Sequence, residues 1–363
     1  MLTWRQRERR RRNIIRASAA VALAALLLLL FFLDLYWRPL DTLFASQKAP
    51  SLPAMEAGEL RVHFLDVGQG DCTLIQFPDG KAMMVDGGDG SADAYIGEYC
   101  RAVGVQKFDC VLLTHPDDDH AAGLSSVLRT FGADTVWAPY FPASYNEAFG
   151  SFLGEAAACG ANVRISQLYE HILSDSRENF YYAMILSPLS PSIEGSYYTQ
   201  ANAEGASSQD VNDSSAVLYL EYAGRKLLLS GDASTSVENA LVTDYTQTGG
   251  EIFSFEAETA WGTEELSPGL ADIDFLKVPH HGGAGSTGEA LLSLCRPRLY
   301  FISCGRGNGY FHPSSDTLAR IRAAVPEAEF FRTDELGSIC LSIAADGGVT
   351  VMTGRGVNLY HGD

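Results

Sequence analysis

Short apolar segments rich in β-branched and aromatic residues recur along the chain after residue 60, and this pattern predicts strands. They occur at residues 61–65, 73–77, 82–85, 108–113, 216–220, 226–229, 275–278, 299–302 and 339–343. Helix-length stretches lie between some of them, at residues 123–131, 145–159, 289–295 and 314–324. Because strands and helices are mixed along one chain, the sequence predicts a layered α/β fold with sheets inside and helices outside.

Two stretches interrupt this pattern. Residues 195–210 are rich in glycine, serine, alanine and asparagine, and residues 243–270 alternate polar, aromatic and glycine residues without a clear period. Long segments of this kind lie on the surface of a domain and often carry function. We therefore predict two surface insertions that could border a site.

The first 59 residues have a different character. Residues 17–33 carry no charge, and the apolar segment 17–37 matches the ~20 residues needed to cross a bilayer. A basic arm precedes it in residues 1–16, so the positive-inside rule predicts a single-pass anchor in the cell membrane, with a cytoplasmic N-terminus and an extracellular body. The alternative is a cleaved signal peptide, although its apolar region is usually ~7–15 residues long. Residues 38–59 are predicted to be a linker and residues 60–363 one domain.

The net charge of −19 hides an asymmetry between these parts. Seven arginines and one glutamate give residues 1–16 a charge of +6. The other 19 basic and 44 acidic residues give the rest of the chain a charge of −25. Such an acidic body argues against a protein whose main task is to follow a phosphate backbone.

The densest group of potential metal ligands follows the predicted strand 108–113. His115, Asp117, Asp119 and His120 place two imidazoles and several carboxylates in one short loop. This density of charge is costly to bury without a cation, and these residue types bind divalent metals. The alternative is a solvated turn in which an aspartate caps the helix that follows.

Two further predicted strands end in similar residues. Asp232 follows the strand at 226–229, and His280 and His281 follow the strand at 275–278. An isolated aspartate after a strand is often only a turn former, but three strand ends that carry histidine and aspartate fit a site with two metal ions.

These motifs carry a resemblance over residues 60–353. The chain resembles the metallo-β-lactamase superfamily, and within it the C-terminal domain of the ComEC competence proteins. The supporting motifs lie at residues 62–71, 86–88, 115–120, 212–215, 230–232, 280–282, 308–313 and 332–334. The resemblance implies a four-layer αββα sandwich.

The resemblance also implies a set of ligands for two divalent ions, zinc or manganese. His115 and Asp117 would bind one ion, Asp119 and His120 the other, and Asp232 would bridge them. His280 is the predicted further ligand of the second ion, with His281 as the alternative. The superfamily has a histidine where this chain has Asp117, so the first site is richer in oxygen, which favours Mn²⁺ over a firm Zn²⁺ assignment.

Other residues are predicted to support this centre. Asp86, which precedes two glycines, is placed to accept the second N–H of a metal-binding imidazole. Asp71, Asn212 and His281 are likewise expected to contact the ligands. His312 follows a glycine-rich loop and is a candidate to contact a phosphoryl oxygen or to protonate a leaving group; the alternative is a histidine that only begins a helix.

The sequence thus predicts an extracytoplasmic, metal-dependent hydrolase, in which two ions hold a bridging hydroxide that Asp119 orients. The resemblance favours a phosphodiesterase or nuclease that acts on DNA or another phosphodiester. Hydrolysis of a cell-envelope phosphoester or another small ester is the alternative within enzymes. A non-catalytic metal-binding interaction module is the alternative outside them.

Overall fold

The computed structural model describes residues 4, 50–354 and 356–362. Residues from 50 onward belong to one compact unit, Ala49–Asp363. The predicted arm, anchor and first part of the linker lie almost entirely outside the described residues. Within the described ranges, no helix combines the length and apolar character that a membrane span requires.

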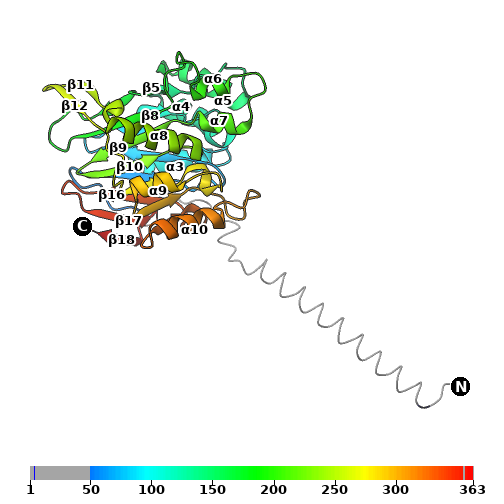
Figure 1. The fold of residues 1–363 in the computed structure, drawn as a ribbon. Helices are drawn as coiled ribbons and strands as arrows, with labels where there is room; N and C mark the ends of the chain where they lie inside the picture. The colour runs from blue at the N-terminus through cyan, green and yellow to red at the C-terminus, as the bar shows by residue number, and fades with distance from the viewer. Residues whose placement is uncertain (1–3, 5–49, 355, 363) are drawn as a thin grey trace. The chain divides into compact units, whose positions relative to one another are not determined.

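Two mixed β-sheets form the centre of this unit (Figure 1). The first has, in order across it, β18 (Asn358–Gly362), β17 (Val349–Thr353), β16 (Ile339–Ile343), β1 (Leu60–Phe64), β2 (Thr73–Gln76), β3 (Ala82–Val85), β4 (Phe108–Leu112), β5 (Ala133–Ala138) and β6 (Asn162–Ile165). The second has β15 (Glu329–Arg332), β14 (Leu299–Ile302), β13 (Phe275–Lys277), β10 (Arg225–Leu229), β9 (Val217–Tyr222), β8 (Tyr181–Ser187) and β7 (His171–Leu173).

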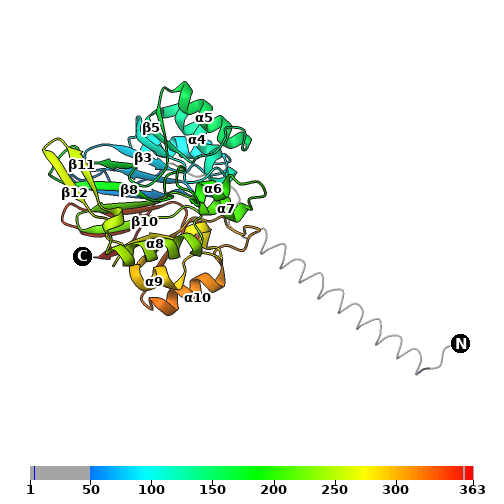
Figure 2. The same cartoon turned by 45° about the horizontal axis from the view of Figure 1, so that its top comes forward.

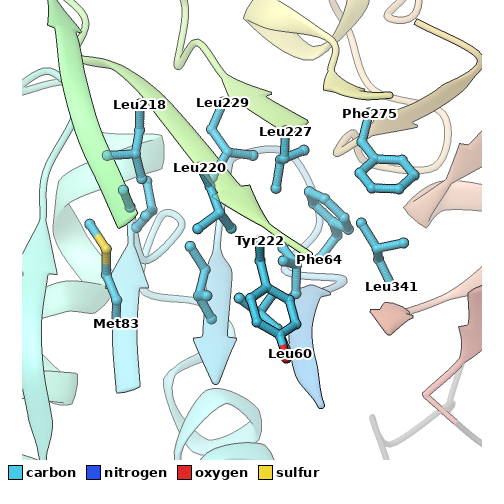
Figure 3. Close-up of a cluster of buried hydrophobic side chains, with 14 of the residues drawn as sticks. Leu60, Phe64, Met83, Leu218, Leu220, Tyr222, Leu227, Leu229, Phe275 and Leu341 are labelled. Atoms are coloured by element: carbon cyan, nitrogen blue, oxygen red, sulfur yellow. The ribbon is translucent and has the colours of Figure 1, made fainter. Parts of the chain in front are cut away.

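The two sheets pack face to face through a shared apolar core. Side chains of β1, β3 and β16 meet those of β9, β10 and β13 there, as Figure 3 shows, and β2 contributes Ile75 to the same core. On β9, Leu218 and Leu220 point into this core, whereas Val217 and Tyr219 belong to a second core on the other side of the sheet. This alternation follows from the two-residue period of a strand, and both faces of β9 are therefore buried.

Helices cover the outer faces of both sheets (Figure 2). The first sheet packs against α3 (Asp93–Ala102), α4 (Asp118–Phe131) and α5 (Glu147–Ala158), and the second against α8 (Thr235–Thr248), α9 (Glu289–Cys295) and α10 (Ser315–Ala324). The predicted layered α/β fold is confirmed. Five further short helices lie within residues 50–354: α6 (Tyr197–Ala201), α7 (Ser208–Asp213), η1 (Glu251–Phe253), η2 (Pro279–Gly282) and α11 (Thr333–Leu336).

The predicted insertions are partly ordered. Residues 195–210 contain α6 and the start of α7. Residues 243–270 contain the end of α8, η1 and a hairpin of β11 (Phe255–Thr259) and β12 (Gly262–Leu266) that forms its own small sheet. Their polar composition hid these elements, because short helices and exposed hairpins bury few apolar side chains.

Helix α4 begins at Asp118, earlier than the predicted start at residue 123. Asp117 occupies the N-cap with extended backbone, and Asp118 and Asp119 lie in the first turn, where their charges interact favourably with the helix dipole.

A close contact between Gly123 of α4 and Gly87 holds the first half of this helix against the turn after β3. A Cβ atom on Gly123 would lie 2.0 Å from the carbonyl oxygen of Gly87, so only glycine permits this approach.

Candidate metal centre

Three strand ends supply the side chains of the centre. His115 follows β4 of the first sheet, Asp232 follows β10 of the second, and His281 lies in η2 directly after β13. Strands β3 and β4 are parallel, as are β10, β13 and β14. Carboxyl ends of neighbouring parallel strands meet at one sheet edge, which is a common place for a ligand site.

One group of potential ligand atoms comprises His115, His120 and Asp232, all buried, with one ligand atom of each within 4.8 Å of the others. The Nε2 atom of His120 lies 3.3 Å from Oδ1 of Asp232. None of His115 Nε2, His120 Nε2 and Asp232 Oδ1 makes a hydrogen bond of normal geometry. Buried polar atoms are costly without a partner, so this convergence fits a bound cation.

A second group shares His120 with the first and adds Asp119 and His281. The Nε2 atom of His281 lies 3.4 Å from Oδ2 of Asp119 and 3.7 Å from Oδ2 of Asp232. It too makes no hydrogen bond of normal geometry. Asp232 therefore faces both groups, one oxygen toward each. Imidazole nitrogens and carboxylate oxygens are the donors that zinc and manganese accept.

Hydrogen bonds on the far side of the rings set their direction. Asp86 accepts hydrogen bonds from the backbone N–H and the hydroxyl of Thr114 and from Nδ1 of His120, each at 2.8 Å. Nδ1 of His281 donates to the carbonyl oxygen of Ser303 at 2.9 Å. With Nδ1 engaged as a donor, Nε2 is the nitrogen of each ring that faces the cluster and that would offer its lone pair to a metal, which is the arrangement that metal-binding histidines use.

The backbone after β13 is strained. His280 and His281 have φ values of 51° and 54°, a left-handed conformation that costs residues other than glycine ~1–2 kcal/mol each. The N–H of His280 donates to the carbonyl of Gly231, which ties this turn to the turn that carries Asp232. Strain of this kind persists where the surrounding structure fixes it, often at functional sites.

The strained turn directs the two adjacent imidazoles differently. His281 is buried, whereas the side chain of His280 is 29% exposed. Nε2 of His280 lies 3.7 Å from Oδ2 of Asp232 and 3.5 Å from Nδ2 of Asn212. The sequence predicts His280 as the further ligand of the second ion, with His281 as the alternative. The geometry favours His281, which is the histidine that lies within reach of Asp119 and His120.

Asp117 and His312 lie at the margin of the cluster. The carboxylate of Asp117 makes no N-cap hydrogen bond and lies 3.7 Å from Nε2 of His115. A surface cleft of about 510 Å³ begins at Asp117 and Asp119 and reaches Tyr145. The ring of His312 is 5.4 Å from that of His280 and 6.2 Å from that of His281, measured between centroids.

A buried lysine, which the sequence did not single out, lies beneath the cluster. Lys277 on β13 is 2% exposed, and its ammonium group contacts Oδ2 of Asp71. Oδ1 of Asp71 lies 3.4 Å from Nδ1 of His281. The signal was present in the sequence, because a charged residue inside an apolar strand must find a partner when it is buried. Asp71 thus links Lys277 to a ring of the centre.

These contacts shift the proton affinities of the cluster. Burial alone would raise the pKa of Asp71, but the charges of Lys277 and His281 outweigh it and hold this pKa well below its usual range. Burial would lower the pKa of His281, whereas the charges of Asp232 and Asp71 raise it to about 10. Without a metal this ring therefore keeps its proton at neutral pH, and metal binding would displace that proton.

Comparisons with known proteins agree with this geometry. A family model described as "Metallo-beta-lactamase superfamily" matches residues 65–306. ComE operon protein 3 of Bacillus subtilis (strain 168) is 24% identical over 307 residues, which are 78% of this chain and 33% of that protein. Recombination protein 2 of Haemophilus influenzae is 29% identical over 266 residues, 72% of this chain and 26% of that protein. This chain thus matches a third or less of the length of these relatives.

Among solved structures, CmlA, a diiron β-hydroxylase from Streptomyces venezuelae, is 12% identical and aligns with a TM-score of 0.39 over 73% of this chain and 47% of that chain. The resemblance inferred from the motifs is confirmed by the family match, which covers well over half of the chain. The chain belongs to the metallo-β-lactamase superfamily.

Proposed function

We propose that this protein is a metal-dependent hydrolase of phosphodiesters. One observation carries the proposal: three buried Nε2 atoms, from His115, His120 and His281, converge on Asp232 without hydrogen-bond partners. Asp119, His120 and His281 would hold one divalent ion, and His115 and Asp117 another, with Asp232 between them. Zinc and manganese both suit this donor set.

Two bound ions would acidify a water molecule and withdraw charge from the scissile group. The side chains of this chain would orient the reactants. Asp119 is half-buried, so its carboxylate faces both the cluster and the cleft and is placed to accept a hydrogen bond from the attacking water. Burial would raise the pKa of Asp119, but the close contact with the ring of His281 and the charge of His120 lower it to about 2, which keeps it ionised.

His312 has two predicted roles, and its surroundings favour one. Burial and the neighbouring rings of His280 and His281 lower the pKa of His312 below its usual value. Its ring is therefore neutral near pH 7. A neutral imidazole donates a hydrogen bond to a phosphoryl oxygen readily, whereas protonation of a leaving group requires the charged form.

Two arguments support a phosphodiester as the substrate class. One relative, Recombination protein 2, is named for a DNA process, and DNA is joined by phosphodiesters. The centre also has no need of a protein nucleophile, because metal-activated water can attack phosphorus directly. We further propose that residues 17–37 anchor the protein in the cell membrane with the hydrolase domain outside, a proposal that rests on the sequence pattern alone.

The purified 363-residue chain, stripped with a chelator and reloaded with Mn²⁺ or Zn²⁺, is expected to hydrolyse bis-p-nitrophenyl phosphate and single-stranded DNA. Chelation should remove the activity, and the metal should restore it. Release of p-nitrophenolate and gel analysis of labelled DNA measure the two reactions. Absence of hydrolysis of both substrates with every metal tested would refute the proposed function.

A further inference from the structure

Two adjacent aromatic side chains stand in solvent beside the metal centre. Tyr310 is 70% exposed and Phe311 is 87% exposed. They belong to residues 305–312, a segment between β14 and α10 that we term the aromatic loop and that ends at His312. Single exposed apolar residues are common, but a neighbouring pair at the margin of a site marks a surface that binds something.

Hydrogen bonds from the side chain of Asn308 to the backbone hold the aromatic loop as a turn. Its Oδ1 accepts hydrogen bonds from the N–H groups of Tyr310 and His312, and its Nδ2 donates to the carbonyl oxygens of Gly305 and His312. At its start, the N–H of Gly305 donates to Oε1 of Gln69. Phe311 has a φ of 59°, a left-handed conformation that costs ~1–2 kcal/mol outside glycine. The loop thus exposes the apolar ring of Phe311 to water while the backbone of this residue is strained.

The rings of this loop lead toward the centre. Tyr310 and His312 have nearly parallel rings, with centroids 5.8 Å apart and an interplanar angle of 28°. His312 and His281 are again nearly parallel, with centroids 6.2 Å apart and an angle of 29°. Since Nε2 of His281 faces Asp119 and Asp232, a planar group stacked on the loop would lie close to the reacting centre.

We propose that the aromatic loop stacks an unpaired nucleobase of the strand whose phosphodiester enters the metal centre. This inference rests on the proposed function and narrows its substrate class to single-stranded nucleic acid. Stacking of a base on an aromatic side chain contributes substantially and tolerates any sequence, because every base has a flat face. Bases within a duplex have both faces covered by their neighbours, so a duplex does not offer this contact.

The charge of the protein agrees with recognition through bases. The chain after residue 16 carries a charge of −25, which leaves few cations for a phosphate backbone. Arg306 is an exposed cation on the aromatic loop itself, and its Nε donates to the carbonyl of Asp334. A strand that crosses the loop would therefore meet two exposed rings and one cation, so stacking on the rings would supply more of the contact than charge does.

The test measures binding of a fluorescein-labelled single-stranded oligodeoxynucleotide by anisotropy, at fixed salt and with chelator present to prevent cleavage. Tyr310→Ala and Phe311→Ala are each expected to weaken binding by about 5- to 100-fold. Tyr310→Phe, which keeps the ring, should bind like the unaltered protein. Tyr169→Ala removes an exposed tyrosine that precedes β7, outside the aromatic loop, and serves as the matched control.

A second comparison separates stacking from contact with the sugar-phosphate backbone. The unaltered protein should prefer the normal strand to one of the same length with abasic sites, and the Tyr310→Ala/Phe311→Ala double variant should lose most of this preference. Equal binding by all variants, or equal binding of the duplex and the single strand, would overturn the inference. Hydrolysis is assayed separately. If the double variant still binds and cleaves DNA as the unaltered protein does, only the stacking role is refuted. If the rings are needed for binding but no hydrolysis occurs, only the proposed function is refuted.

Discussion

Replacement of Asp232 by asparagine is expected to lower kcat/KM for phosphodiester hydrolysis by about a thousandfold, which corresponds to roughly 4 kcal/mol of lost transition-state stabilisation. Asp232 offers one oxygen to each group of potential ligands, 3.3 Å from Nε2 of His120 and 3.7 Å from Nε2 of His281. An amide keeps the size of the side chain but has no negative charge and only one oxygen. The substitution therefore weakens both positions at once.

The matched control for this experiment is Asp272→Asn. Asp272 is an exposed acid that precedes β13, at the opposite end of this strand from His281, and it belongs to none of the groups that could hold an ion. It should retain activity within about twofold, since an exposed charge in water interacts weakly with its surroundings. Circular dichroism of both variants shows whether they fold. Full activity in a folded Asp232→Asn protein would remove this carboxylate from the mechanism.

Replacement of His281 by alanine is expected to weaken the binding of one metal ion by at least about 100-fold, because even residues that only support metal ligands contribute ~10–100-fold. His280→Ala is the matched comparison, since it alters the neighbouring residue of the same type in the same turn. His280 is partly exposed and belongs to none of the groups of ligand atoms, so its loss should leave the ion count unchanged.

Calorimetric titration with Mn²⁺ or Zn²⁺, with elemental analysis of the dialysed proteins, measures the difference between these variants. The reverse order, in which His280→Ala loses the ion and His281→Ala keeps it, would support the assignment of His280 that the sequence predicts. If both variants keep all of their bound metal, neither histidine is a ligand.

The sequence was sufficient to group most of the candidate ligands because His115, Asp232 and His281 each come soon after an apolar strand. The carboxyl ends of parallel strands in one sheet meet at one edge, which places Asp232 beside His281; His115 comes from the other sheet and meets them through the packing of the two sheets. The layered architecture followed from the same runs. These features depend on local pattern and on the general geometry of sheets.

The orientation of individual side chains could not be predicted in the same way. The choice between His280 and His281 depends on two consecutive left-handed residues, and nothing in a sequence of non-glycine residues signals that conformation. The pairing of Lys277 with Asp71 joins residues that are far apart in the chain, and only the packing of the two sheets brings them together. The exposure of Tyr310 and Phe311 could not be predicted either, because phenylalanine is among the residue types most often buried and tyrosine is intermediate.

The central claim is that the buried histidines and aspartates form a binding site for divalent ions. Titration of Mn²⁺ or Zn²⁺ into the chelator-treated 363-residue chain, followed by calorimetry and by elemental analysis after dialysis, tests it most directly. We expect about two ions per chain in the unaltered protein. Binding should release protons to the buffer, because the pKa of His281 lies at about 10 without a metal. A chain that binds neither metal, or binds each as well after Asp232→Asn as before, would contradict the claim.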